Sequence, residues 1–153
     1  AGATVLGVAQ RAYDLSKQYA FERVQAGGPI VTHQLQKARL ARMAMQIEAA
    51  RAYIWKAAWE AGRPDQDPMH ASLSKVFASE VAVHVCQAAL ELWAAAGYMR
   101  KNPLEKLIRD AHSFLHSDGT NDVLTLKAGN YLVPTDPADP VYSKRAAEAA
   151  AGR

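Results

Sequence analysis

The chain has 153 residues, of which 50% are hydrophobic and 22% charged, and 18 lysine and arginine residues against 15 acidic ones give a net charge of +3. This length suffices for one domain that buries roughly 70% of its unfolded surface without staples. The basic residues are interspersed with acidic ones, and no apolar run reaches the ~18 residues of a membrane span, so we expect neither a nucleic-acid partner nor a membrane span.

The single cysteine and the first residues indicate the context of the chain. Cys86 lies in an apolar helical run, so we expect a core thiol, no internal disulfide and a reducing compartment. No signal peptide is recognisable, and a cytoplasmic location is predicted. The sequence starts at Ala1 without a methionine and already has a helical pattern, so we expect a piece of a longer protein.

The first predicted helix covers about residues 5–23, because apolar side chains recur there at helical spacing, namely Val8, Ala12, Leu15 and Tyr19. Residues 27–29, Gly-Gly-Pro, combine a helix stop signal with a residue that cannot continue a helix. We therefore expect a sharp reversal, with Thr32 as the N-cap of the next helix.

Two long helices are predicted next. The second helix ends at about Gly62 and carries one apolar stripe, formed by Leu35, Leu40, Met43, Ile47, Ala50, Ile54 and Ala57. Residues 63–68 are polar and contain prolines, which is typical of a surface loop. The third helix spans about residues 69–96, and its predicted buried side carries Leu73, Val76, Phe77, Val81, Val85, Ala88 and Leu92.

The last elements are shorter. Pro103 is the predicted first residue of a helix that runs to about residue 115, and a final helix spans about residues 120–132. The prolines at positions 134, 137 and 140 predict an extended tail. The sequence thus indicates an all-α domain over residues 1–133, an antiparallel four-helix bundle with one extra short helix, and a proline-containing tail over residues 134–153.

Residues 117–122, Ser-Asp-Gly-Thr-Asn-Asp, form the most informative motif. They place the carboxylate of Asp118 on a tight turn, Gly119 gives the backbone its freedom, and Thr120 supplies a hydroxyl at the helix start. A carboxylate held in this way can act as a base, and the free N–H groups can bind an anionic ligand. The same turn is equally suited to be a plain helix cap.

Other side-chain patterns have structural explanations. Di-iron centres in four-helix bundles need Glu-x-x-His pairs, and the sequence contains none. His112 and His116 have the spacing of a two-histidine metal site, but exposed or capping histidines explain them better, so no metal is predicted. The three tryptophans, Trp55, Trp59 and Trp93, suit either the core or an interface between subunits.

An ordered series of segments resembles the C-terminal helical domain of the acyl-CoA dehydrogenases, up to about Leu132. Residues 23–30, Arg-Val-Gln-Ala-Gly-Gly-Pro-Ile, are similar to the family's Arg-x-Gln-Phe-Gly-x-Pro-Ile turn, and Gln34 follows at the usual distance. The other matching segments are residues 7–12, 40–43, 48–51, 75–80, 97–98, 103–110 and 118–122.

The resemblance implies a flavoprotein of acyl-CoA β-oxidation, which takes hydrogens from the α and β carbons of an acyl-CoA substrate. It also implies FAD as the cofactor and an electron-transferring flavoprotein as the usual partner. The family's commonest base is the Glu of a Glu-Gly-Thr motif, which matches Asp118 here. Because Asp is one methylene shorter, this base would reach about 1.5 Å less far.

The cofactor residues implied by the resemblance come from several segments. Arg23, Gln25 and Gln34 would contact the FAD of a partner subunit. Glu91 and Gly97 belong to the counterpart of the family's Gln-x-x-Gly-Gly-x-Gly motif, where Gly97 would allow a close backbone approach. A further flavin-contacting stretch would include Thr120 and Asp122.

Departures from the family pattern keep other hypotheses open. Ala26 replaces an aromatic residue, Ala94 and Ala95 replace two glycines, and Glu91 replaces a neutral glutamine. A non-catalytic assembly subunit or domain of a heteromeric enzyme is therefore the alternative, and an oxidase branch of the same fold is a third reading. Since the family's N-terminal helical and middle β domains are absent, we expect an inactive fragment that forms homo- or hetero-oligomers through its bundle.

Overall fold

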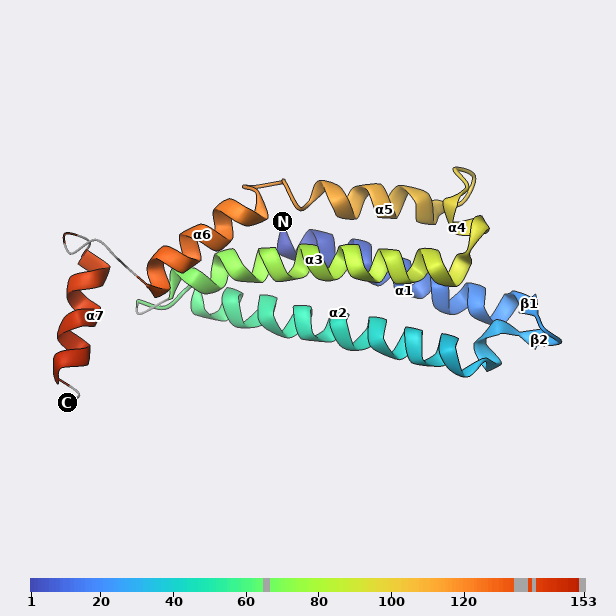
Figure 1. The fold of residues 1–153 in the computed structure, drawn as a ribbon, viewed down its shortest axis with the longest axis horizontal. Coiled ribbons are helices and arrows are strands. Elements are labelled where there is room, and N and C mark those ends of the chain that lie inside the picture. The colour runs from blue at the N-terminus through green and yellow to red at the C-terminus, as the bar shows by residue number, and fades with distance from the viewer. Residues whose placement is uncertain (65–66, 134–137, 139, 152–153) are drawn as a thin grey trace.

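A computed structural model describes residues 1–64, 67–133, 138 and 140–151. Its framework consists of three long helices, α1 (Gly2–Glu22), α2 (Gln34–Glu60) and α3 (Pro68–Trp93), which pack against one another. The shorter helices α5 (Pro103–Ser113) and α6 (Asn121–Leu132) also pack against α3 (Figure 1). The predicted all-α bundle with a short additional helix is confirmed.

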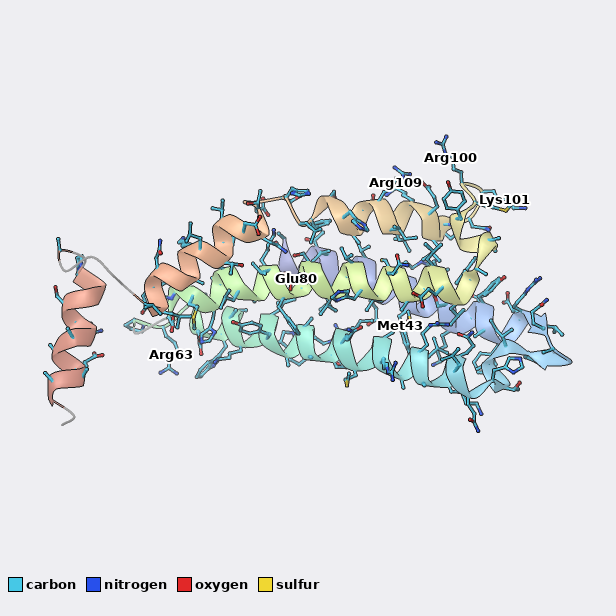
Figure 2. The ribbon with its side chains drawn as sticks, in the orientation of Figure 1. Met43, Arg63, Glu80, Arg100, Lys101 and Arg109 are labelled. Atoms are coloured by element: carbon cyan, nitrogen blue, oxygen red, sulfur yellow. The ribbon has the colours of Figure 1, made fainter. Side chains whose placement is uncertain are left out.

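The core lies where α1, α2 and α3 meet. Ala9 and Ala12 of α1 and Ala78 and Ala82 of α3 have no exposed surface, and such small side chains let helices approach closely. Met43, which Figure 2 labels on α2, is also fully buried. Each Å² of buried apolar surface stabilises the folded state by roughly 25 cal/mol, so this shared interior holds the three helices together.

The reversal after α1 is confirmed, and it is a small hairpin. Strands β1 (Val24–Gln25) and β2 (Gly28–Pro29) pair antiparallel. The two loop residues have positive φ angles, 49° at Ala26 and 86° at Gly27, as in the tight hairpin turns that suit twisted strands. The pairing of these short strands was not expected from the sequence.

The start of α2 differs from the prediction. Residues 30–32 form a 3₁₀ turn, η1 (Ile30–Thr32), and His33 is the N-cap of α2. Thr32 is therefore not the cap, and its hydroxyl donates instead to the carbonyl of Pro29 at 2.8 Å. This hydrogen bond stabilises the turn that precedes α2, so the hydroxyl does not cap the helix.

Two predicted core positions and one helix end are also wrong. Leu35 is 65% exposed and Phe77 is 37% exposed, because both lie at the edge of the stripe that their helices bury. The third helix ends at Trp93 and not near residue 96, since Ala94 turns the backbone to φ 51° and ψ −138°. A one-turn helix, α4 (Ala95–Tyr98), follows this break.

The expectation of an extended tail is wrong for its last part. Residues 140–151 form a helix, α7 (Pro140–Ala151), whose first residue is a proline. Proline is tolerated in the first helical turn because the N–H there has no helical partner anyway, and the alanines that follow favour a helix. Pro134 and Pro137 lie outside the described residues.

Two other expectations are confirmed. Pro103 is the first residue of α5. Cys86 is a fully buried core thiol that donates to the carbonyl of Leu107 at 3.7 Å, and burial raises the pKa of this thiol to about 12. Within the described residues, no helix has both the length and the apolar character that crossing a membrane requires.

Candidate functional site

The turn that carries Asp118 joins α5 to α6. Asp118 and Gly119 both have positive φ angles, 55° and 97°, a conformation that glycine adopts freely and aspartate tolerates better than most residues. Thr120 is the N-cap of α6, and its hydroxyl oxygen accepts the N–H of Val123 at 3.3 Å. The predicted turn and the predicted helix start are thus present.

A buried lysine anchors this turn to α3, and the sequence motifs assign it no role. The ammonium of Lys75 donates to the carbonyl of Gly119 and to the side-chain oxygen of Asn121, both at 2.9 Å. The amide of Asn121 also donates to the hydroxyl of Ser79 at 3.0 Å. Burial lowers the pKa of Lys75, and the nearby carboxylate of Asp118 acts in the opposite direction.

A sequence signal for Lys75 did exist. Lys75 is three and four residues before Ala78 and Ser79, so it falls on the same face of α3 as these buried residues. Only 6% of Lys75 is exposed. A lysine on the inner face of a bundle helix needs acceptors, and these could have been sought in a polar turn elsewhere in the chain.

Asp118 stands at the edge of a cleft of about 450 Å³. The lining comes from the start of α1, the last turns of α2, and the first turns of α3 and α6. Six of its thirteen residues are alanine, and Ile54 and Leu124 add larger apolar side chains. The side chain of Asp118 is 73% exposed, and the amino group of Ala1 lies 3.8 Å from its Oδ2. A carboxylate beside a largely apolar hollow is an arrangement that suits a base acting on a bound molecule.

Thr120 and Asp122 belong to a second hollow, of about 440 Å³, next to that turn. Its lining includes the helix α3 residues Glu80 and His84 and the histidine that follows α5, His116. Figure 2 labels Glu80 on α3. His112 does not share this hollow, and its Nδ1 lies 2.8 Å from the carbonyl of Ile108 in the preceding turn. No group of three metal-binding side chains occurs in the part of the chain that the structure describes.

Arg23, Gln25 and Glu91 meet in a third hollow, of about 420 Å³, at the hairpin end of the bundle. Arg23 follows α1, Gln25 lies on β1, and Glu91 belongs to the last turn of α3, so the fold brings together residues 66 to 68 positions apart. Gln34 starts α2 but does not line this hollow. We call this hollow, whose lining includes Arg23, Gln25 and Glu91, the hairpin pocket.

The charge of Glu91 is balanced inside the chain. Its carboxylate accepts a hydrogen bond from the guanidinium of Arg39 at 2.9 Å. Arg39 also donates a hydrogen bond to the side-chain oxygen of Gln36 at 2.8 Å. The side chain of Arg39 is 19% exposed and that of Glu91 is 53% exposed. The negative charge that Glu91 adds to the hairpin pocket therefore comes with its own counter-ion.

One of the two alanines that stand at glycine positions of the motif, Ala94, has an unusual backbone. Ala94 has φ 51° and ψ −138°, a conformation that costs a residue with a Cβ about 1 to 3 kcal/mol. Gly97 has an internal reason to be glycine: a Cβ there would lie 2.9 Å from Cβ of Trp93 and 3.0 Å from Cδ2 of Leu104. A contact between Gly97 and a cofactor stays a prediction.

Comparison with known proteins shows the family. Residues 1–131 match the family described as acyl-CoA dehydrogenase, C-terminal domain. The chain belongs to the acyl-CoA dehydrogenase family. This membership confirms the resemblance that the motifs indicated.

Several relatives of this acyl-CoA dehydrogenase domain are similar over most of its length. The chain is 40% identical over 133 residues to 3-sulfinopropanoyl-CoA desulfinase of Paraburkholderia xenovorans, which covers 87% of the chain and 34% of that protein. Its fold is similar to butyryl-CoA dehydrogenase of Megasphaera elsdenii, with a TM-score of 0.80, 35% identity, and coverage of 86% of this chain and 34% of that one.

A second solved structure with a similar fold is that of the electron transferring flavoprotein of Acidaminococcus fermentans. The TM-score is 0.81 at 32% identity, with 87% of this chain and 35% of that chain covered. The chain thus spans about a third of the length of the relatives that it matches.

Proposed function

We propose that this chain is the C-terminal part of an FAD-dependent acyl-CoA dehydrogenase and that Asp118 is its catalytic base. The observation that carries the proposal is the position of Asp118, beside an apolar cleft and on a turn that Lys75 ties to α3. The proton on the α carbon of a thioester is only weakly acidic, so its removal needs a base that is aimed and partly shielded from water.

The residues of this chain would divide the work as follows. The Asp118 carboxylate accepts the α proton and becomes a neutral acid. The ammonium of Lys75 keeps the turn in place through its hydrogen bonds to the Gly119 carbonyl and the Asn121 side chain. The lining of the cleft gives the reacting carbons an apolar surface to lie against. FAD held by the residues named below would supply the hydride acceptor for the β carbon.

The hairpin pocket fits the phosphate-bearing part of FAD. Arg23 has no side-chain ion pair within the described residues, so its guanidinium is available for charge-assisted hydrogen bonds to a pyrophosphate. Gln25 adds a neutral side chain to the same wall, and Arg39 offsets the charge of Glu91. Thr120 and Asp122, in the second hollow, are proposed for another part of the flavin, and Gln34 and Gly97 complete the proposed set.

The proposed partners follow from surfaces and relatives. The substrate is an acyl-CoA, as the names of the desulfinase and of butyryl-CoA dehydrogenase include a CoA thioester. Trp55 and Trp59 on α2 are 68% and 67% exposed, as is expected of side chains that another subunit covers. We propose that the bundle forms a homo- or hetero-oligomer through this face, and that an electron-transferring flavoprotein takes the electrons.

A second candidate function is a non-catalytic assembly domain in a heteromeric enzyme. The strained backbone at Ala94 and the charged Glu91 favour it, because both depart from the family's flavin motif. Flavin content per chain in the purified full-length protein separates the two. One flavin per chain supports the catalytic role, half supports a mixed assembly, and none supports the scaffold.

The test of the base is Asp118→Asn in the full-length enzyme, since asparagine keeps the shape and cannot accept the proton. We expect turnover to fall by about 10²- to 10⁴-fold while flavin content stays unchanged. The matched control is Asp14→Asn, which changes an exposed aspartate on α1 whose one side-chain partner among the described residues is Gln10. Unchanged turnover in Asp118→Asn would exclude Asp118 as the base.

A further inference from the structure

Lys75 is the most buried charged side chain near the Asp118 turn. Its residue is 6% exposed, and the side chain reaches from α3 across to the start of α6. An ammonium has three donors and is strongly hydrated, so it is retained in an interior only where acceptors replace water. Here the carbonyl of Gly119 and the side-chain oxygen of Asn121 provide two of these acceptors.

The carboxylate of Asp118 is not held by contacts of its own. Within the described residues it makes no hydrogen bond, and 73% of its side chain is exposed. The backbone is therefore what directs the side chain. Lys75 binds the carbonyl of the next residue, Gly119, so it holds the peptide between Gly119 and Thr120 and with it the turn that carries Asp118.

The cleft contains few other charges. Among its lining residues the titratable groups are the Asp118 carboxylate, the Lys75 ammonium and the amino group of Ala1, and the other side chains are apolar or hydroxyl-bearing. On the opposite side of the turn, Glu80, His84, His116 and Asp122 line the second hollow. Lys75 is thus the buried cation on the cleft side.

We propose that Lys75 is a positioning residue for Asp118, which holds the turn of residues 118–121 against α3 and keeps a positive charge beside the carboxylate. This inference rests on the proposed role of Asp118 as the base. Lys75 itself does not touch the substrate or exchange a proton. Its two effects, on direction and on charge, can be separated by different substitutions.

The first variant is Lys75→Met in the full-length enzyme, which keeps most of the apolar stem and removes the ammonium. We expect kcat to fall about 10- to 100-fold, while flavin content and the KM for acyl-CoA change less than about threefold.

Two variants serve as comparisons. Lys75→Arg keeps the charge and the donors, so it should restore part of kcat. Lys17→Met removes an exposed lysine from α1 and should leave kcat unchanged. A purely structural loss in Lys75→Met would lower the yield of folded enzyme without lowering kcat per bound flavin.

If Lys75→Met does not fold, Asn121→Ala gives a second test. It removes the side-chain oxygen that accepts from the ammonium at 2.9 Å and leaves the Gly119 carbonyl as an acceptor, so the turn is held less firmly while Lys75 keeps a partner. We expect kcat to fall less than in Lys75→Met, with flavin content and the KM for acyl-CoA little changed.

The outcomes distinguish this inference from the proposed function. If Asp118→Asn loses turnover but Lys75→Met or Asn121→Ala keeps the wild-type kcat, the positioning role is wrong and the base stands. A rise in KM or a loss of flavin as large as the fall in kcat also overturns it. If Asp118→Asn keeps full turnover, the proposed base is wrong and the role of Lys75 falls with it.

Discussion

The Asp118 turn and the hairpin pocket lie near different ends of α3, and they are built in opposite ways (Figure 1). At the turn, a buried ammonium binds a backbone carbonyl and a side-chain amide, so the geometry is set within the chain. In the hairpin pocket, Arg23 and Gln25 are exposed. Glu91, which pairs with the more buried Arg39, has a side chain that is 53% exposed.

The difference shows which parts of the site this domain can complete alone. Hydrogen bonds from a buried charge are strong and fix one geometry, whereas exposed side chains keep their rotamer freedom until something binds them. The turn is therefore preorganised by this chain, whereas the side chains of the hairpin pocket keep more freedom. Four measurements test this difference.

The largest expected effect is on the pH dependence of the free energy of unfolding, through Cys86 in the middle of α3. This helix connects the two regions. Burial raises the pKa of Cys86 from 9.0 to about 12, so the folded state holds a proton that the unfolded state releases. This contribution to stability is complete below pH 9 and is lost as the pH rises toward 12, on the order of 1 kcal/mol per pH unit.

Cys86→Ser is the matched control, because serine keeps a donor to the carbonyl of Leu107 and does not ionise in this range. The free energy of unfolding, measured by urea denaturation from pH 8 to 11, should fall more steeply in the wild type. Parallel curves would show that the thiol is accessible to water in the folded state.

The next effect concerns the packing beneath the hairpin pocket. Gly97→Ala should lower the free energy of unfolding by about 1 to 3 kcal/mol, since the new methyl group would meet Trp93 and Leu104. Gly7→Ala is the control: no atom lies within 4 Å of its added Cβ, so it should stabilise α1 by about 0.5 to 1 kcal/mol. Equal effects of the two substitutions would contradict tight packing at Gly97.

A smaller effect is expected at the strained residue of the same pocket. Ala94→Gly should raise the free energy of unfolding by about 1 kcal/mol, because glycine adopts φ 51° without a Cβ clash. Ala95→Gly, one residue on and inside α4, should instead lower it by about 0.5 to 1 kcal/mol. If both substitutions destabilise equally, the backbone at Ala94 is not strained.

The smallest effect is the coupling between Arg39 and Glu91. A double-mutant cycle with Arg39→Gln and Glu91→Gln should give about 0.2 to 1 kcal/mol, and this coupling should shrink in high salt because the pair is partly exposed. A coupling above about 2 kcal/mol would mean that the hairpin pocket is as preorganised as the turn.

Local signals predicted the elements well where a single residue decides them. Pro103 at the start of α5, Thr120 at the start of α6 and the reversal at Gly27 were all confirmed, because caps and turns depend on neighbours in the sequence. Thr32 and the tail were misjudged, since a hydroxyl has two possible uses and a proline can begin a helix as well as end one.

The candidate site was predicted in part. The motifs named Asp118, Arg23, Gln25 and Glu91, and the fold brings the last three into one pocket. Lys75, however, received no role, because the acceptors that explain its burial are 44 and 46 residues away. Contacts between distant segments leave no periodic trace in the chain.

The sequence by itself determined the all-α bundle, the acyl-CoA dehydrogenase family and the turn that presents Asp118. These follow from helical periodicity, from capping residues and from motifs of a few neighbouring positions. Only the tertiary structure decided that α3 supplies the cation under that turn and that Arg39 balances Glu91, since both contacts exist only once helices distant in sequence pack together.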